Sequence, residues 1–399
     1  MNSAKIGIVM AITPKGRFGE KPAAWMGRVF AIVFSAAFVA SAPGVMQEAM
    51  AEPIAAVMTY EGGANTQRSS SFAAGAKAYF ARINAQGGVH GRPLHVVLAE
   101  FPGDVSKHAE ILRATARNTG AVALLGCASD DVCQMSAQVA ADLKVPLVGP
   151  LSGSSALARQ KNAFVFRIRP GYAREASAIA AQLTSLACTN VVLVTDALDQ
   201  QESTSVIAQA LGQRGIKVDL VRVSTASKSE IAAMMKKLGS GGYHAAVLNM
   251  NVKSIESIVD AGMSEREEWP RVLITLANGS LQPLMTYFKG RVVGFSQVVP
   301  NPEILTYQLS RDLELDAGKY GSTLSFSFDG MEGYLAARLL VEGLRRTGSK
   351  FTPERLAETL ASQDSWEIGG FRLSFVPGRD SGSDWVDVGL RSRSGTLVR

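Results

Sequence analysis

The chain has 399 residues, of which 47% are hydrophobic, and its 41 Lys and Arg residues face 35 Asp and Glu residues. The resulting net charge of +6 is small for this length and gives no support to a nucleic-acid-binding protein. The sequence contains no GxSxG elbow, no P-loop and no GxGxxG motif after a strand, and its four His residues lack metal-site spacing. We therefore expect no enzyme, no metal and no cofactor.

The N-terminal segment has the features of an export signal. An uncharged apolar run over residues 29–40 follows Arg28, and residues 49–51 (Ala-Met-Ala) provide a small-x-small cleavage pattern. The run is too short for a membrane span, which needs about 20 residues. We expect residues 1–51 to be a cleaved signal peptide, with Met26 as an alternative translation start. The remaining 348 residues carry 36 basic and 33 acidic side chains, and their length is typical of two domains.

Three Cys residues follow the predicted signal peptide: Cys127, Cys133 and Cys188. An exported chain meets an oxidising environment, which favours a disulfide between Cys127 and Cys133. Such a bridge would pin the loop between them and stabilise the fold by about 2 kcal/mol in the loop-entropy model. The alternative is two reduced thiols at the start of a helix. Cys188 lies just before a buried strand, and we expect it to be unpaired.

The first predicted strand covers residues 54–59 and is followed by a polar loop over residues 60–65. The next stretch predicts a helix, and its apolar face is formed by Phe72, Ala76, Tyr79, Phe80 and Ile83. Two Gly residues at 87–88 end this helix. Residues 84–94 therefore predict a helix C-cap and a tight turn, which lead into a strand over residues 94–98.

Two strand-loop-helix units follow in series. Apolar runs over residues 121–126 and 145–148 predict two parallel strands, with one helix between them and another starting at Leu157. The strands end in polar loops at 127–130 and 149–155. Both loops then lie at the same edge of the sheet, where open α/β sheets bind ligands, and their hydroxyl and N–H groups suit a carboxylate or another anion. The alternative is that these Ser and Gly residues only cap helices and form turns.

A second set of strands and helices begins after residue 170. Its predicted strands cover residues 191–195, 218–223, 245–248 and 272–276, and its predicted helices include residues 203–213 and 229–238. A long helix over residues 331–342, a capped helix from Pro353 and a hairpin-like segment from Gly369 follow. The alternation of strands and helices predicts an α/β protein with parallel central sheets.

Four stretches carry a family resemblance: N…GGV.GR.L at 84–94, VPLVGPLSGSSAL at 145–157, FVFRIRPGYAREA at 164–176 and GYLAAR at 333–338. They resemble the solute-binding proteins of ABC importers, in the leucine/isoleucine/valine-binding branch. The resemblance implies the type I periplasmic binding protein fold, in which two Rossmann-like lobes with parallel central sheets are joined by a three-stranded hinge. It places lobe 1 at residues 52–169 plus 297–364 and lobe 2 at residues 170–296 plus 365–399.

The same resemblance implies a function. Proteins of this family capture a small polar solute between the lobes and deliver it to the membrane subunits of an ABC importer. We therefore expect a small-molecule ligand and an ABC permease as partners, and a monomer without nucleic-acid binding or stable membrane insertion. No Cys lies near the predicted cleavage site to carry a lipid anchor, so the expected compartment is the periplasm. The alternative is a periplasmic ligand-sensing module for a membrane receptor, because the fold also serves that role.

The ligand contacts of the family map onto both lobes. In lobe 1 the matching positions are Tyr60, Ala128, Ser129, Ser152, Gly153 and Ser154. In lobe 2 they are Leu198, Asn249 and Asn278. Tyr172 belongs to an Arg-x-x-Tyr-x-x-Glu pattern at the first crossing between the lobes, where it either faces the cleft or packs the hinge.

The lobe 2 positions depart from those of amino-acid binders in this family. Asp196 is followed by Ala-Leu-Asp where the family usually has an aromatic residue and Gly, and Asn278 cannot supply the acid that often pairs with a ligand ammonium. A neutral polar solute or an organic or aromatic carboxylate is therefore expected at least as much as an α-amino acid. Asp199, Glu61 and Asp130 are the other residues that could supply the missing negative charge.

Overall fold

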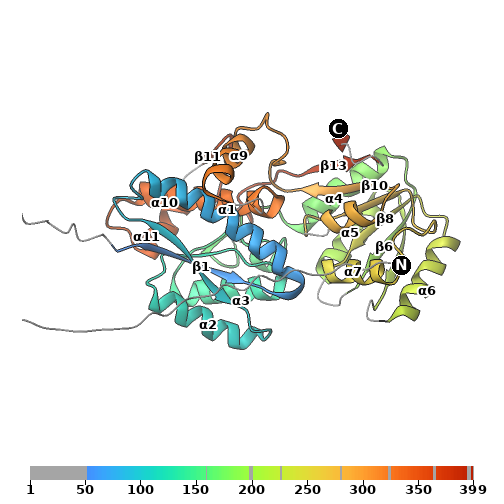
Figure 1. Cartoon of the computed structure of the whole chain (residues 1–399), viewed down its shortest axis with the longest axis horizontal. Coiled ribbons are helices and arrows are strands. Elements are labelled where there is room, and N and C mark those ends of the chain that lie inside the picture. The colour runs from blue at the N-terminus through green and yellow to red at the C-terminus, as the bar shows by residue number, and fades with distance from the viewer. Residues whose placement is uncertain are drawn as a thin grey trace, which may run out of the picture. The chain divides into compact units, whose positions relative to one another are not determined.

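The computed structural model describes residues 52–158, 160–196, 201–224, 227–278, 281–321, 325–362, 365–392 and the backbone of 397–398. The predicted signal peptide and the candidate ligand contact Leu198 lie outside these residues. The described residues form two lobes, each built around its own sheet (Figure 1). Among these residues, no helix combines the length and the hydropathy that a membrane span needs.

Lobe 1 contains a five-stranded parallel sheet in the order β2-β1-β3-β4-β5. Its strands are β1 (Ile54–Tyr60), β2 (Leu94–Glu100), β3 (Ala123–Leu125), β4 (Leu147–Val148) and β5 (Val165–Phe166). Between them lie α1 (Thr66–Ala85), α2 (Val105–Asn118), α3 (Asp130–Leu143) and the 3-10 turns η1 (Gly63–Asn65) and η2 (Ser155–Leu157). Elements from late in the chain pack on the same lobe: α9 (Gln308–Tyr320), α10 (Phe328–Thr347), α11 (Pro353–Ser362) and the hairpin of β11 (Trp366–Ile368) and β12 (Phe371–Leu373).

Lobe 2 contains a seven-stranded sheet in the order β14-β13-β10-β9-β8-β6-β7. Its parallel strands are β6 (Asn190–Thr195), β7 (Lys217–Arg222), β8 (Ala245–Asn249), β9 (Val272–Thr275) and β10 (Val292–Gln297). The edge strands β13 (Asp387–Arg391) and β14 (Leu397–Val398) join it in antiparallel fashion. Its helices are α4 (Tyr172–Ser185), α5 (Gln201–Gln213), α6 (Lys228–Ser240), α7 (Val252–Asp260) and α8 (Leu281–Tyr287).

Each sheet is buried between two layers of helices. Along β1, Ile54 and Met58 belong to the core with α1 and α10, whereas Val57 belongs to the core with α2 and α3. Along β6, Val192 packs with α6 and α7, and Leu193 packs with α4 and α5. Strands that are buried on both faces are apolar throughout, which is why they appear in the sequence as short continuous hydrophobic runs. The predicted two-lobed α/β fold is confirmed.

In the part of the chain that the structure describes, three segments connect the lobes, at residues 167–171, 298–307 and 374–386. The third connection starts later than the sequence predicts. Trp366 and Leu373 are fully buried in the lobe 1 core, so the predicted assignment of residues 365–399 to lobe 2 is wrong for β11 and β12. The reason is the predicted hairpin itself, which closes through two Gly residues with φ of +60° and +81° and turns back onto lobe 1. The other predicted lobe boundaries stay predictions.

Most predicted strands and helices are present. Their ends differ from the prediction by two residues or fewer, apart from those of α10, which begins three residues before and ends five residues after the predicted range 331–342. The exception is the helix predicted to start at Leu157. Residues Ser155–Leu157 form only the 3-10 turn η2, and the Ser154 side chain caps it by accepting a hydrogen bond from Ala156 N at 3.2 Å. Seven residues separate this turn from β5, which leaves no room for a helix of ordinary length.

Helices α1 and α10 touch backbone to backbone at two Gly residues. A Cβ atom on Gly75 would lie 1.9 Å from the carbonyl oxygen of Gly330, and one on Gly333 would lie 2.0 Å from the carbonyl oxygen of Phe72. These positions need Gly for close approach and not for an unusual backbone angle. The contact fixes the spacing between the first turns of the two helices.

Gly333→Ala is therefore expected to destabilise the protein by about 3 kcal/mol, at the upper end of the usual range for overpacking, because backbone atoms must move apart. The matched control is Gly318→Ala in α9, where an added Cβ would meet no atom within 4 Å. This control should leave stability unchanged or raise it by up to about 1 kcal/mol, since Ala favours helix. Urea unfolding measures both, and similar losses in the two variants would contradict the close-contact argument.

Candidate functional site

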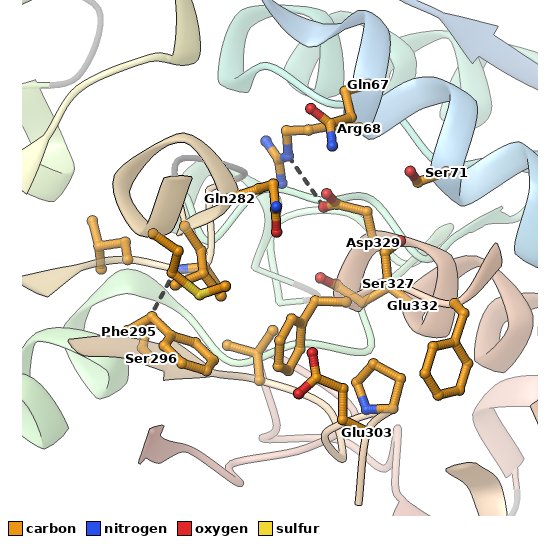
Figure 2. Close-up of a pocket in the computed structure, with 18 of the residues that line it drawn as sticks. Gln67, Arg68, Ser71, Gln282, Phe295, Ser296, Glu303, Ser327, Asp329 and Glu332 are labelled. Atoms are coloured by element: carbon orange, nitrogen blue, oxygen red, sulfur yellow. Dashed lines mark hydrogen bonds and ion pairs between the residues drawn. The ribbon is translucent and has the colours of Figure 1, made fainter. Parts of the chain in front are cut away.

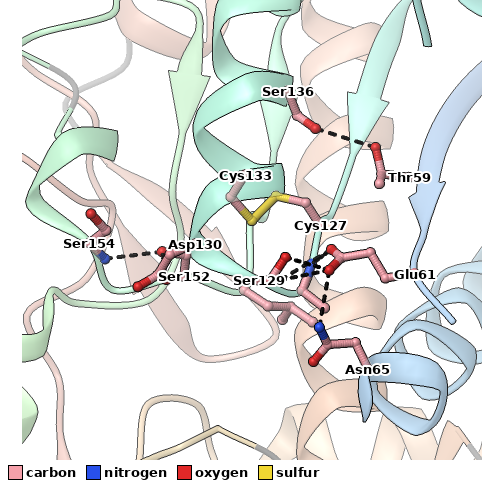
Figure 3. Close-up of a disulfide and its surroundings, with 12 residues drawn as sticks. Thr59, Glu61, Asn65, Cys127, Ser129, Asp130, Cys133, Ser136, Ser152 and Ser154 are labelled. Atoms are coloured by element: carbon pink, nitrogen blue, oxygen red, sulfur yellow. Dashed lines mark hydrogen bonds between the residues drawn. A yellow bond between two sulfur atoms is a disulfide. The ribbon is translucent and has the colours of Figure 1, made fainter. Parts of the chain in front are cut away.

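A disulfide closes the loop between β3 and α3 (Figure 3). Cys127 follows β3, Cys133 lies in the first turn of α3, and both side chains are buried. Ser129 is the N-cap residue of α3, so the backbone N–H groups of this turn point out of the helix end. The bridge thus fixes a small set of donors at the carboxyl end of a central strand.

The donors of this first loop hold a carboxylate of the protein itself. Glu61, which is 2% exposed, accepts hydrogen bonds from Ala128 N and from the N and Oγ of Ser129 (Figure 3). Asn65 Nδ2 donates to the same carboxylate at 3.1 Å, and Glu61 N donates to Ser69 Oγ at 3.1 Å. The anion-binding character predicted for this loop is therefore present, but Glu61 uses it.

The second loop also binds a carboxylate, and this one comes from the other lobe. Ser154 Oγ donates to Glu202 Oε2 at 2.7 Å, and Ser155 N donates to Glu202 Oε1 at 2.8 Å. Burial by itself would raise the pKa of Glu202, but these hydrogen bonds outweigh it and the net pKa is lowered. Glu202 stands at the start of α5, so the contact joins the polar edge of lobe 1 to lobe 2.

Tyr172 both packs at the hinge and reaches the polar edge. Its ring lies against Gly153, where a Cβ would come within 2.6 Å of the ring, and its hydroxyl donates to Asp130 Oδ1 at 2.7 Å. Ser152 Oγ donates to the same oxygen at 2.6 Å. Burial raises the pKa of Asp130 even though both hydrogen bonds favour its ionised form. These four residues form one connected group beside the first crossing between the lobes.

The remaining predicted contacts pair with groups of their own lobe. Asn249 Nδ2 donates to Ser203 Oγ and Thr204 Oγ1, both at 2.9 Å, and so ties β8 to the start of α5. Asn278 Oδ1 accepts from Thr275 Oγ1 at 3.2 Å. In lobe 1, Tyr60 Oη lies 2.9 Å from Ser70 Oγ.

The structure has a cavity of about 260 Å³ with walls from both lobes (Figure 2). Lobe 1 contributes residues at the start of α1 and around the start of α10: Gln67, Arg68, Ser71, Phe326, Ser327, Phe328, Asp329 and Glu332. Lobe 2 contributes Val252, Leu276, Ala277, Leu281, Gln282, Met285, Phe295 and Ser296. Val298, Pro302, Glu303 and Arg391 also line the cavity. None of the described residues that the sequence predicts as ligand contacts belongs to these walls.

Arg68 connects the cavity to both polar loops. Its Nη1 donates to Ala128 O at 2.8 Å, its Nη2 donates to Leu151 O at 3.0 Å, and its Nε lies 3.3 Å from Asp329 Oδ1. Figure 2 shows the ion pair between Arg68 and Asp329, which spans the first turns of α1 and α10. The guanidinium therefore takes carbonyl oxygens that a ligand donor could otherwise use.

A second Arg lies behind the cavity at the first crossing. Arg169 is 1% exposed and donates to Leu151 O in lobe 1 and to Ala277 O in lobe 2, both at 2.7 Å. It pairs with Glu175 at 3.2 Å, whereas Glu332 Oε1 lies 3.8 Å from its Nη1, beyond hydrogen-bond distance. Burial raises the pKa of Glu332 to about 7, against the attraction of Arg169.

The charged residues in and around the cavity are only partly visible in the sequence. The Arg-x-x-Tyr-x-x-Glu spacing identified Arg169 and Glu175, and Glu61 was recognised as an available acid. Arg68 and Glu332 carried no motif, because each lies within a helix and its partners are far away in sequence. Across the part of the chain that the structure describes, no group of three or more His, Cys, Asp or Glu side chains could hold a metal ion.

Thiol counting tests the disulfide. Mature protein that is denatured without reductant should show one free thiol, at Cys188, and three after reduction. Replacing both Cys127 and Cys133 by Ser should lower stability by about 2 kcal/mol in the loop-entropy model. Three free thiols before reduction would contradict the bridge.

Glu332→Gln tests the electrostatic cost of the buried acid. The pKa of Glu332 is raised from 4.5 to about 7, so between these values the folded state keeps a proton that the unfolded state loses, and stability falls as pH rises. The variant should therefore be more stable than the wild type at pH 8, by up to about 3 kcal/mol, and equally stable near pH 4. Glu342→Gln, in an exposed pair on the same helix, is the control and should change stability little. A less stable Glu332 variant at pH 8 would contradict the argument.

Solved structures share the architecture of this chain. A substrate-binding periplasmic protein from Ralstonia solanacearum is 21% identical, with a TM-score of 0.74 and a match over 86% of this chain and 99% of that one. A possible leucine/isoleucine/valine-binding protein from Rhodopirellula baltica is 18% identical, with a TM-score of 0.75 and coverage of 88% and 97%. An ABC transporter substrate-binding protein from Desulfitobacterium hafniense, in complex with Leu, is 20% identical, with a TM-score of 0.68 and coverage of 87% and 99%. At such identities the likeness shows the fold.

No curated protein is detectably similar to this chain. The model of the periplasmic binding protein family matches residues 53–381, which include nearly all of both lobes. This match agrees with the two-sheet architecture, the three connecting segments and the cavity with walls from both lobes. The chain belongs to the periplasmic binding protein family.

Proposed function

We propose that this protein is a periplasmic solute-binding protein that captures a small polar solute, such as an amino acid, an organic or aromatic carboxylate or a related compound, and delivers it to an ABC importer. The observation that carries this proposal is the cavity with walls from both lobes. A solute in it touches α1 and α10 of lobe 1 together with α8 and β10 of lobe 2. It therefore stabilises the arrangement in which these walls face each other.

The polar contacts between the lobes support opening and closing. Glu202 reaches Ser154 and Ser155 across the edge, and Lys253 of α7 comes close to η1, where a Cβ on Gly63 would lie 3.3 Å from its Nζ. Each hydrogen bond to the Glu202 carboxylate contributes only about 1.5–3 kcal/mol net, because water replaces it on opening. A solute that bridges the lobes can shift such an equilibrium.

The predicted loop residues have an indirect role in this proposal. Ser129 holds Glu61 and Ser154 holds Glu202, so the two loops shape the edge of the cleft through acidic side chains of the protein. The solute then lies in the neighbouring cavity, beside Arg68 and the first turn of α10.

A binding screen followed by scattering tests the proposal. In a library of small metabolites, a solute at a hundred times its dissociation constant should stabilise the protein by about 2.7 kcal/mol, which is visible as a rise in melting temperature. The same solute should reduce the radius of gyration in small-angle scattering, because the lobes close. Gly318→Ala, which lies outside the cavity, should bind it equally well.

Two outcomes would count against this function. If no compound of the library raises the melting temperature or changes the radius of gyration, capture of a small solute is refuted. If a solute binds and closes the lobes but a reconstituted permease does not take it up, delivery is refuted and a ligand-sensing module for a membrane receptor is favoured.

A further inference from the structure

We propose that the cavity takes a solute with a cationic nitrogen and a compact apolar body, and that this nitrogen lies against the carboxylate of Glu332. This inference rests on the proposed function, because it names the class of solute that is captured. It follows from three features of the site. The hydrogen-bond donors of the two polar loops already bind carboxylates of the protein, the acidic side chains at the cavity outnumber the basic ones, and the remaining walls are apolar.

The two loops predicted to hold a ligand carboxylate already hold carboxylates of the protein. Glu61 accepts the N–H groups of Ala128 and Ser129, and Glu202 accepts the N–H of Ser155 and the hydroxyl of Ser154. A solute carboxylate would have to displace Glu61, which is 2% exposed, or place a third negative charge beside these two. Carboxylates that share one small site repel each other strongly where water is excluded.

Among the described charged residues that line the cavity, Glu332 is the acid without a hydrogen-bonded cation. Arg68 pairs with Asp329, and Arg391 pairs with Glu303. Behind the wall, Arg169 pairs with Glu175, whose other oxygen accepts from Ser296 Oγ and from Ala277 N. Glu332 is the acid that remains.

Glu332 is placed to receive a donor from the cavity. It is 4% exposed and lines the cavity, yet among the described residues no group donates a hydrogen bond to it. Its closest cation is Arg169 at 3.8 Å, and that guanidinium already makes three shorter contacts. A buried carboxyl without a hydrogen bond is unfavourable when ionised, and an ammonium supplies both the charge and the donors that it lacks.

The walls around this acid suit an apolar body beside the cation. Phe295 of lobe 2 and Phe328 of lobe 1 meet edge to face with ring centroids 5.2 Å apart, and Leu281 and Met285 of α8 also face the cavity. Aromatic rings attract cations through their faces and bury hydrocarbon surface at the same time. The contact between Phe295 and Phe328 also lies at the boundary between the two lobes. A solute beside these rings therefore directly favours the closed arrangement of the lobes.

Four compounds of similar size separate the charge classes: benzylamine, benzyl alcohol, benzoate and phenylglycine. They are measured beside a metabolite library sorted into cations, neutral compounds, anions and zwitterions. We expect the cations to give the largest rises in melting temperature, with benzylamine above its three analogues. Larger shifts for benzoate, phenylglycine or their classes would overturn the inference and leave the proposed function standing. No shift in any class would remove both.

Variants then test the role of Glu332, with titration calorimetry of the tightest-binding amine. Glu332→Gln should weaken this amine at least tenfold and should leave benzyl alcohol unchanged, because only the charge is lost. Glu342→Gln, on the same helix but away from the cavity, should bind the amine like the wild type. Binding of the amine by Glu332→Gln within twofold of the wild type would overturn the inference.

The pH dependence provides a second readout. Arg68, Arg169, Asp329 and Glu175 are the charged groups around Glu332, and burial raises the pKa of Glu332 to about 7. Protons compete with the amine for Glu332, so affinity should fall below pH 7, by up to tenfold for each pH unit. This dependence should be absent in Glu332→Gln. A pH-independent affinity of the wild type for the amine would contradict the placement of the cation.

Discussion

The guanidinium of Arg169 sits where the chain first leaves lobe 1 and bonds to carbonyl oxygens of both lobes. Removing this charge from water is costly, and the contacts with Glu175, Leu151 O and Ala277 O compensate for that cost. Its pairing with Glu175 anchors α4, and Glu175 in turn holds Ala277 N and Ser296 Oγ at the ends of β9 and β10. The hinge and the lobe 2 wall of the cavity therefore depend on the same group of bonds.

A second constraint concerns anions at the edge of the sheets. N–H groups at the start of a helix attract negative charge wherever it comes from, and in this chain Glu61 and Glu202 satisfy them from within. The composition of such a loop therefore predicts that an anion is bound there. The composition alone does not tell whether a ligand or a side chain of the protein provides this anion. This distinction needs the three-dimensional partners of the loop.

The sequence predicted the framework well, because the framework depends on local patterns. Apolar runs identified the buried strands, and residues 84–94 predicted a turn that Asn84 closes through its side chain and Leu94. The pairs that define the cavity could not be predicted in this way. Arg68 and Asp329 are 261 positions apart and meet only because α1 and α10 cross. The helix predicted to start at Leu157 does not form for a different reason. The short distance between η2 and β5, and not the local helix propensity, excludes a helix of ordinary length there.

The backbone contact of α1 with α10 also divides the cavity into two kinds of wall. On the lobe 1 side, the two helices are in backbone contact, so they cannot move closer together and neither Gly can be replaced by a larger residue. The charged groups on their first turns are therefore held at a fixed distance from each other. On the lobe 2 side, α8 is a seven-residue helix whose Gln282 is exposed and whose Met285 is half-buried, and both side chains line the cavity. Divergence among related proteins would then keep the charge arrangement of one wall and vary the size and shape of the other, so that new solutes are reached through α8 while the fold stays intact.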